Sequence, residues 1–313
     1  MAVDDISFSL DTGEIVGLVG ESGSGKSVTS RSILGLIPQP PGAVKGSIRL
    51  EGVELVGQSQ RDLQRVRGER VAMIFQDPMT SLNPVYSISE QVAETLRFHK
   101  GLGQAEAMQR TVDLFVRVGL PRAKERLRAY PHELSGGMRQ RVMIAMAIAC
   151  DPRLLIADEP TTALDVTIQA QILDLLRELN QERGMGLLLI THDLGIVAET
   201  CQRVMVMYAG RIVEQAPATA LFAQPLHPYT IGLLNSIPSI EQRRERLQPI
   251  SGAPPDLARR PSGCSFHPRC PLARDRCQAE VPALRELHPG HLTACHFAEE
   301  LEAVNVSTPG VPN

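Results

Sequence analysis

Residues 20–27, with the sequence GESGSGKS, have the residue types and spacing of a phosphate-binding loop. They fit the pattern GxxxxGK[ST] at every fixed position. Glycines let backbone N–H groups approach phosphate oxygens closely, and the N-terminus of a following helix would face the negative charge. We expect Lys26 to reach the β- and γ-phosphates of a nucleotide and the Ser27 hydroxyl to bind Mg²⁺. The predicted phosphate contacts are Gly20, Glu21, Ser22, Gly23, Ser24, Gly25, Lys26 and Ser27.

Two adjacent carboxylates, Asp158 and Glu159, follow the apolar residues 154–157. Nucleotide hydrolysis needs a carboxylate that holds Mg²⁺ and a group that orients the attacking water. The carboxyl ends of buried parallel strands face the crevice in which open α/β sheets bind ligands. We therefore predict that Asp158 holds the metal and that Glu159 polarises the water. For the pair taken alone, an ordinary acidic helix cap is the alternative.

The composition limits the class of protein. A chain of 313 residues that is 43% hydrophobic can form one large domain with room for an appendage. Its formal net charge of −3 gives no reason to expect a partner made of nucleic acid. The longest apolar runs fall far short of the roughly 18 residues of a membrane span, and no signal peptide is apparent. We therefore expect a cytoplasmic protein without disulfides.

Strands and helices alternate along the sequence around these groups. Continuous apolar runs predict buried strands, and an apolar stripe over residues 166–183 predicts a helix that ends at Gly184. This alternation predicts an α/β fold with a parallel sheet core. An alternating segment at 6–10 and hairpins at 46–55 and 204–213 indicate an antiparallel part. The buried strands are predicted at 71–75, 154–157 and 187–190.

The pattern also predicts the domain organisation. Residues 1–237 should form the first domain, with an all-helical subdomain at about 83–150. A Pro- and Arg-rich linker is expected at 238–262, followed by a cysteine-bearing region at 263–297. The last residues, 298–313, are expected to be a disordered tail.

Further motifs of residues 1–237 resemble those of ATP-binding cassette (ABC) ATPases, which have a P-loop fold. Residues 134–140, LSGGMRQ, match the signature of that family. Gln76 matches its Q-loop, Asp165 its D-loop and His192 its switch histidine. The resemblance implies that Gln76, Glu159 and His192 are catalytic and that Ser27, Gln76 and Asp158 bind Mg²⁺.

The resemblance also implies a head-to-tail dimer in which ATP lies between the phosphate loop of one cassette and the signature of the other. Asp165 would contact the second cassette. Because residues 135–137 open a predicted helix, their N–H groups would form a second anion site. A plain N-cap and turn is the alternative for these residues. The signature residues expected to act on the partner's ATP are Ser135, Gly136, Gly137 and Gln140.

Three stretches, at 74–84, 138–165 and 226–234, are similar to the ATPase subunits of oligopeptide and dipeptide importers. The sequences of these stretches resemble those of the D-type subunit, which implies an F-type partner cassette. A dimer of two copies of this chain is the alternative. Two integral membrane permeases and, indirectly, an extracytoplasmic substrate-binding protein are implied as well. The chain would then lie at the cytoplasmic face of the bacterial inner membrane. Nickel and glutathione importers share much of this sequence, so the substrate is left open.

Four cysteines lie close together near the C-terminus, with five, six and seventeen residues between them. By spacing alone they indicate a metal, without identifying it. The resemblance to peptide importers implies a [4Fe–4S] cluster. Zn²⁺ and unligated thiols are the alternatives. The four candidate ligands are Cys264, Cys270, Cys277 and Cys295.

The sequence departs from the family pattern in one respect. The family has an aromatic residue that stacks on adenine upstream of the phosphate loop, and this sequence lacks one at that spacing. Either Met1 is a late start and a first strand is missing, or the nucleotide is held less tightly.

Two other interpretations compete with the importer ATPase. A soluble cassette ATPase that acts on ribosomes or DNA is the rival class, which the net acidity disfavours. A non-catalytic half of an asymmetric pair is disfavoured by the intact Lys26, Asp158, Glu159 and His192.

Overall fold

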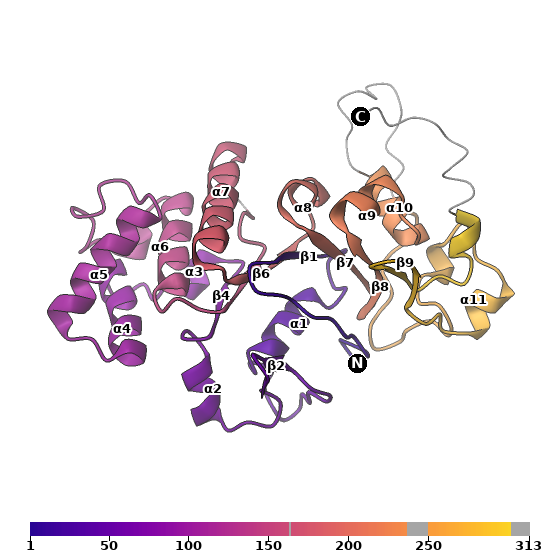
Figure 1. Cartoon of the computed structure of the whole chain (residues 1–313), viewed down its shortest axis with the longest axis horizontal. Coiled ribbons are helices and arrows are strands. Elements are labelled where there is room, and N and C mark those ends of the chain that lie inside the picture. Colours follow the sequence, from indigo (N-terminus) through magenta and orange to yellow (C-terminus); the bar gives the residue numbers. More distant parts are fainter. Residues whose placement is uncertain (163, 237–249, 302–313) are drawn as a thin grey trace. The chain divides into compact units, whose positions relative to one another are not determined.

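The computed structural model describes residues 1–162, 164–236 and 250–301 (Figure 1). The chain divides into two compact units. The first unit comprises residues 1–9, 16–29 and 191–313, and the second comprises residues 10–15 and 30–190. The phosphate loop therefore belongs to the first unit, whereas Asp158 and Glu159 belong to the second.

A mixed sheet organises the first unit. Strands β1 (Ile15–Val19) and β7 (Arg203–Tyr208) are parallel, with Val16 opposite Arg203 and Val19 opposite Val206. The remaining neighbouring strands are antiparallel. Ala209 and Gly210, with φ values of 47° and 81°, form the turn between β7 and β8 (Arg211–Pro217). That turn confirms the hairpin predicted at 204–213. The strand order is β1 (Ile15–Val19), β7 (Arg203–Tyr208), β8 (Arg211–Pro217), β10 (His291–Thr293) and β9 (Arg285–His288).

Three parallel strands form the core of the second unit: β4 (Val71–Ile74), β5 (Leu154–Asp158) and β6 (Gly186–Thr191). Val71 is opposite Leu154, which is itself opposite Gly186. Strands buried on both faces are apolar without alternation, as these are. The predicted parallel core is therefore confirmed. The short hairpin β2 (Arg49–Leu50) and β3 (Val53–Glu54) is also where the sequence predicts it.

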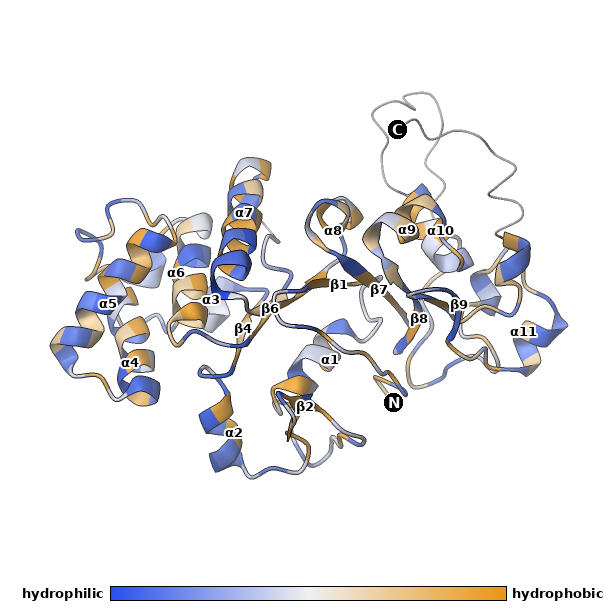
Figure 2. Ribbon diagram, in the orientation of Figure 1, coloured by the Kyte–Doolittle hydropathy of each residue, from blue (hydrophilic) through white to orange (hydrophobic). Residues whose placement is uncertain are grey.

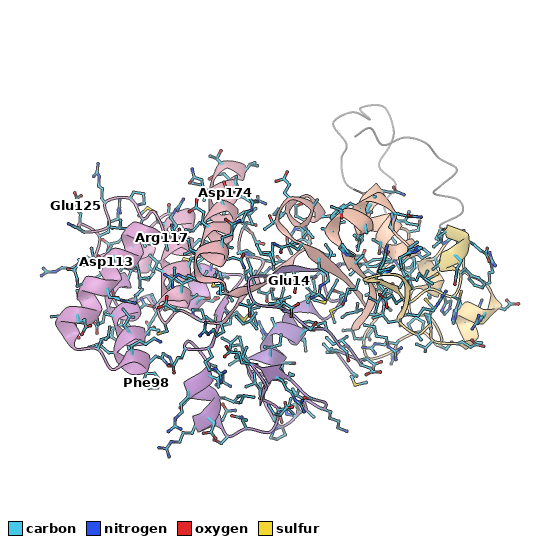
Figure 3. All side chains as sticks on the ribbon, viewed as in Figure 1. Glu14, Phe98, Asp113, Arg117, Glu125 and Asp174 are labelled. Atoms are coloured by element: carbon cyan, nitrogen blue, oxygen red, sulfur yellow. The ribbon has the colours of Figure 1, made fainter. Side chains whose placement is uncertain are left out.

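The helices of the second unit have clear sequence causes. The Ser87 hydroxyl accepts the N–H of Glu90 at 3.3 Å and caps α4, while Gly101 ends that helix with a φ of 66°. Figure 2 shows apolar and polar stretches on α4 and α5, whose buried faces contact α6. Arg117 of α5, which is labelled in Figure 3, pairs with two glutamates of α7 at 3.4 and 2.6 Å. These helices are α2 (Gln60–Val66), α3 (Pro78–Ser81), α4 (Ile88–Lys100), α5 (Gln104–Arg117), α6 (Gly136–Ile148) and α7 (Val166–Arg183).

Shorter helices accompany the sheet of the first unit. The α1 helix (Lys26–Ile33) begins within the predicted phosphate loop, and Asp193 caps α8 (Leu194–Thr200) by accepting the N–H of Gly195 at 2.8 Å. Three more follow: α9 (Ala218–Ala223), α10 (Pro228–Asn235) and α11 (Asp275–Ala279). Within the described parts of the chain, no helix combines the length and the apolar character needed to cross a membrane.

The structure differs from the sequence expectations in three places. Residues 6–10, predicted as a strand, have no regular secondary structure, because that segment has single hydrogen bonds such as Arg203 to the Ser9 carbonyl rather than a ladder. The cysteine-bearing region is no separate appendage, since β10 and β9 extend the sheet of the first unit. Residues 298–301 form a helical turn with Ala298 and Leu301 buried. The rest of the predicted tail and residues 238–249 of the predicted linker lie outside the described residues.

Candidate functional site

The phosphate loop connects β1 to α1 and rests on the β7–β8 turn. Gly210 donates its N–H to the Ser24 carbonyl at 2.7 Å. Gly20 has a φ of 153°, and a Cβ atom there would lie 2.2 Å from the Met207 carbonyl oxygen. Only glycine fits so close to backbone, as the pattern predicts for the first position of this loop. The loop is therefore packed tightly on one side, while Ser22 and Gly23 are exposed on the other.

Lys26 is the first residue of α1 and is 7% exposed. Its Nζ atom donates to the carbonyl of Gly20 at 2.7 Å and to that of Glu21 at 3.0 Å. The ammonium group thus spans the loop, and the partly buried Ser27 follows it. A lysine and the N–H groups of a helix N-terminus suit the phosphates of a nucleotide. The chemistry of this donor set fits ATP with Mg²⁺.

Glu21 makes contacts within the protein that the sequence does not predict. Its backbone N–H, which the sequence assigns to a phosphate, is donated to the Tyr229 hydroxyl at 2.8 Å. Its carboxylate accepts two hydrogen bonds from Arg269, at 2.6 and 3.0 Å. The N–H and the carboxylate of Glu21 are thus both paired within the protein.

In the second unit, the structure brings Gln76 and Glu159 together. Glu159 follows β5, and its Oε2 atom accepts the Gln76 Nε2–H at 2.8 Å and the Thr162 hydroxyl at 2.9 Å. Its φ of 49° is unusual for a residue with a side chain. Such backbone strain, about 1–3 kcal/mol, is concentrated at functional sites. The neighbouring Asp158 ends β5 and is 3% exposed.

His192 lies directly after β6 and directly before the cap of α8. Its side chain is exposed. The preceding Thr191 and the following Asp193 fix the turn, because the Asp193 N–H is donated to the Thr191 hydroxyl at 3.0 Å. His192 is therefore placed at the carboxyl end of a strand, as the sequence predicts.

The signature and the D-loop lie against each other in the second unit. Ser135 caps α6 by accepting the N–H of Met138 at 3.4 Å, and Asp165 caps α7 by accepting that of Ile168 at 3.0 Å. A Cβ atom on Gly137 would lie 2.7 Å from Ile168 Cγ2, so the two helix starts approach closely. Ser135 and Gly136 are exposed at the start of α6.

Gln140 does not share that exposure. It is 2% exposed, and its Nε2 atom has no hydrogen-bond partner among the described residues. The reason is its position one turn into α6, whose following residues from Val142 to Ile148 are largely buried. Gln140 therefore differs from Ser135 and Gly136, which are exposed at the start of that helix.

The four C-terminal cysteines line one pocket, together with Phe266 and Phe297. Burial raises the pKa of Cys270 and of Cys295 to about 11, and the other thiols add to the shift. Cys264 and Cys277 are tied by a backbone hydrogen bond of 2.8 Å. Among the described residues, no three His, Cys, Asp or Glu side chains are close enough to hold a single metal ion. Four thiols lining one pocket are donors of a type that both iron–sulfur clusters and Zn²⁺ use.

Sequence reasoning missed Tyr229 and Arg269, which hold Glu21 of the phosphate loop, and Tyr208, which contacts Arg269. Each lies roughly 190 or more positions from Glu21, and no spacing rule connects them to it. The Arg269 guanidinium lies 5.8 Å from the centroid of the Tyr208 ring. The only signal was the residue type, since arginine is suited to two-bond pairing with a carboxylate.

A nucleoside-triphosphate loop, a paired glutamate and glutamine, and a serine-capped glycine signature define an ATP-binding cassette, and the comparisons agree. The chain belongs to the ABC transporter family, whose model matches residues 3–162. Residues 213–277 match a second model, the C-terminal region of oligopeptide/dipeptide transporters. The resemblance to peptide-importer ATPases is therefore confirmed.

The chain is similar over nearly its whole length to proteins that are named for peptide transport. It is 53% identical over 296 residues to the dipeptide transport ATP-binding protein DppD of Escherichia coli (strain K12), covering 95% of this chain and 90% of that protein. It is also 53% identical over 300 residues to the oligopeptide transport ATP-binding protein AppD of Bacillus subtilis (strain 168), covering 96% and 92%.

Solved structures with a similar fold are also ABC cassettes. One is the dimeric post-hydrolysis state of the cassette MJ0796 bound to ADP and phosphate, with a TM-score of 0.62, 27% identity and coverage of 69% of this chain and 90% of that one. Another is cbiO1 from Clostridium perfringens, with a TM-score of 0.61, 29% identity and coverage of 71% and 84%. The predicted P-loop ATPase fold is thus confirmed.

Proposed function

We propose that this chain is the ATP-hydrolysing, energy-coupling subunit of an importer for dipeptides and oligopeptides. The observation that carries the proposal is the phosphate loop, in which the buried Lys26 begins a helix and spans two loop carbonyls. The substrate class rests on the names of the relatives and on the matched C-terminal region. No described residue favours a nickel or glutathione importer over a peptide importer.

Each motif residue has one proposed role in hydrolysis. Lys26 and the N–H groups of residues 22–27 bind the phosphates, and Ser27, Gln76 and Asp158 hold Mg²⁺, which offsets phosphate charge. Glu159 orients the attacking water, supported by its hydrogen bonds from Gln76 and Thr162. His192 would contact the γ-phosphate.

The exposed start of α6 acts on a second cassette. Ser135 and Gly136 would meet the ATP held by the phosphate loop of the partner, and Asp165 would contact that partner. This role is supported by their exposure at a helix N-terminus and by the dimeric state of the structural neighbour. The partner would be an F-type cassette or a second copy of this chain.

The remaining partners follow from the importer class. Two integral membrane permeases would carry the peptide, and an extracytoplasmic binding protein would deliver it. We place the chain at the cytoplasmic face of a bacterial inner membrane, held there by the permeases. Gentle solubilisation of membranes and identification of the proteins that co-purify with the chain tests this assignment, and recovery of ribosomes or DNA instead would contradict it.

The C-terminal cysteines are proposed to hold a [4Fe–4S] cluster. The support is that Cys264, Cys270, Cys277 and Cys295 line one pocket. Iron and sulfide analysis of anaerobically purified protein, together with absorbance near 400 nm, tests the proposal. One zinc per chain and no iron would favour the Zn²⁺ alternative.

The Glu159→Gln variant tests the catalytic role. The amide keeps the shape of the side chain and cannot accept a proton from water, so ATPase turnover should fall by about 10²–10⁴-fold. ATP should still bind and hold two cassettes together, which light scattering measures. Glu178→Gln, which changes an exposed glutamate on α7, is the matched control. Turnover of Glu159→Gln at the wild-type rate would contradict the assignment.

A further inference from the structure

Glu21 places a carboxylate in the phosphate loop, and Arg269 of the cysteine-bearing region forms an ion pair with it. Arg269 donates from Nη1 to Glu21 Oε2 at 2.6 Å and from Nη2 to Glu21 Oε1 at 3.0 Å. The side chain of Arg269 is 5% exposed and that of Glu21 is 27% exposed. A two-bond pair of this kind has a fixed geometry, unlike a surface ion pair.

The guanidinium is itself held in place. Its Nε donates to the Ser251 carbonyl at 2.9 Å, and Nη1 lies 3.4 Å from the Tyr208 hydroxyl. The rings of Tyr208, Tyr229 and Phe266 pack against one another with centroids 4.5–5.4 Å apart. Arg269 therefore has little freedom to leave Glu21.

Glu21 connects this arginine to the nucleotide-binding lysine. The Glu21 N–H is donated to Tyr229 at 2.8 Å, and its carbonyl accepts from Lys26 Nζ at 3.0 Å. The side chain, N–H and carbonyl of one loop residue are thus all engaged. A shift of Glu21 would move a carbonyl on which Lys26 rests.

Charge gives a second reason for the pair. A free carboxylate in the loop would repel the phosphates of ATP, since like charges at close range destabilise each other. The buried guanidinium offsets that charge through its two hydrogen bonds to the carboxylate. Loss of Arg269 would remove both the anchor and the compensating charge.

We propose that Arg269 is a positioning residue for ATP binding, which acts through Glu21 to hold the phosphate loop in its nucleotide-receptive form. The inference rests on the proposed ATPase function and deepens it. The cysteine-bearing region is then part of the ATP site of this chain, because Arg269 lies in the short 3₁₀ turn His267–Arg269 directly before Cys270.

The test compares ATP affinity in the full-length chain and its variants. The chain contains no tryptophan, so binding is measured with a fluorescent ATP analogue and Mg²⁺. Arg269→Ala should raise the Kd about tenfold or more, with an unchanged far-UV circular dichroism spectrum. Arg285→Ala, which removes another two-bond pair in the same region, with Glu299, should leave the Kd unchanged. Wild-type affinity in Arg269→Ala would overturn the proposal.

A double-mutant comparison separates positioning from general stability. In a Glu21→Gln background, Arg269→Ala should change the Kd by less than about twofold, because the partner of the arginine is already altered. An equal loss in both backgrounds would overturn the proposal. If Arg269→Ala does not fold, Arg269→Lys replaces it. Lysine keeps the charge without the fork, and an intermediate Kd is expected. An Arg269→Lys Kd equal to that of the wild type would then count against the proposal.

The same assay distinguishes failure of the proposed function. Lys26→Ala must abolish binding if the loop is the ATP site. If the wild-type chain does not bind, or if Lys26→Ala binds equally well, the proposed function fails and the role of Arg269 fails with it. If Lys26→Ala loses binding and Arg269→Ala does not, only the inference on Arg269 is wrong.

Discussion

Glu21 in the first unit and Glu159 in the second are held in opposite ways. Glu21 is fixed by Tyr229 and Arg269, which lie 208 and 248 positions further along the chain. Glu159 is fixed by Thr162, three positions away, and by Gln76, 83 positions away. The end of β5 that carries Glu159 is thus held by a nearby turn and by Gln76, whereas the phosphate loop depends on the C-terminal part of the chain.

This difference teaches where each region is vulnerable. A change near Glu159 should affect hydrolysis and leave the loop unaltered. A change at the C-terminal end of the chain should affect nucleotide affinity, although it is remote in sequence from every motif of the family. The following substitutions test the contrast in matched pairs.

The largest effect is expected from Gly20→Ala, compared with Gly137→Ala. The new Cβ at position 20 would lie 2.2 Å from the Met207 carbonyl, which is backbone and cannot move aside. At position 137 the nearest atom, at 2.7 Å, is the Ile168 Cγ2, the end of a side chain. We expect Gly20→Ala to cost roughly 1–3 kcal/mol and to remove ATP binding, and Gly137→Ala to cost less than about 1.5 kcal/mol.

Thermal unfolding followed by circular dichroism and titration with labelled ATP measure both effects. If Gly137→Ala weakened ATP binding to an isolated chain as much as Gly20→Ala does, the two regions would not be independent in the way proposed.

A smaller effect is expected from Tyr229→Phe. The Tyr229 ring is fully buried. The substitution removes its hydroxyl and leaves the Glu21 N–H without that acceptor. An unpaired buried group costs about 1 kcal/mol or more, so the Kd for ATP should rise about threefold to tenfold. The turnover of ATP-saturated protein should stay near the wild-type value. A fall in turnover with no change in Kd would assign the tyrosine hydroxyl to the chemical step instead.

The smallest effect is expected from Thr162→Val. It removes one exposed hydroxyl that donates to Glu159, while Gln76 still holds the carboxylate. The net loss of an exposed hydrogen bond is about 0.5 kcal/mol, so kcat should fall by about twofold with an unchanged Kd for ATP. A larger loss of kcat, measured by phosphate release at saturating ATP, would mean that Gln76 alone cannot hold Glu159.

The sequence predicts the motifs well because their chemistry depends on short, fixed spacing. The phosphate loop and the helix start at residues 135–137 follow from short, fixed spacings, and the parallel core follows from apolar runs that alternate with helices. Strands β9 and β10 were not predicted, since they are only three or four residues long and β10 pairs with β8 across a large sequence separation. The burial of Gln140 was missed for a related reason, because α6 is enclosed by neighbours that its own sequence does not reveal.

The pairing of β10 with β8 has a consequence for any shortened form of the gene. A fragment that stops at residue 237 keeps every family motif, yet it exposes the hydrogen-bonding edge of β8 at Glu214 and Gln215. It also strips His291 from the fully buried Glu214 carboxylate, which that histidine contacts at 2.8 Å. Such a fragment would have a complete set of motifs and a strand ready to pair with its own copies. Recombination that exchanges cassettes between importers would therefore have to carry the C-terminal region along with them.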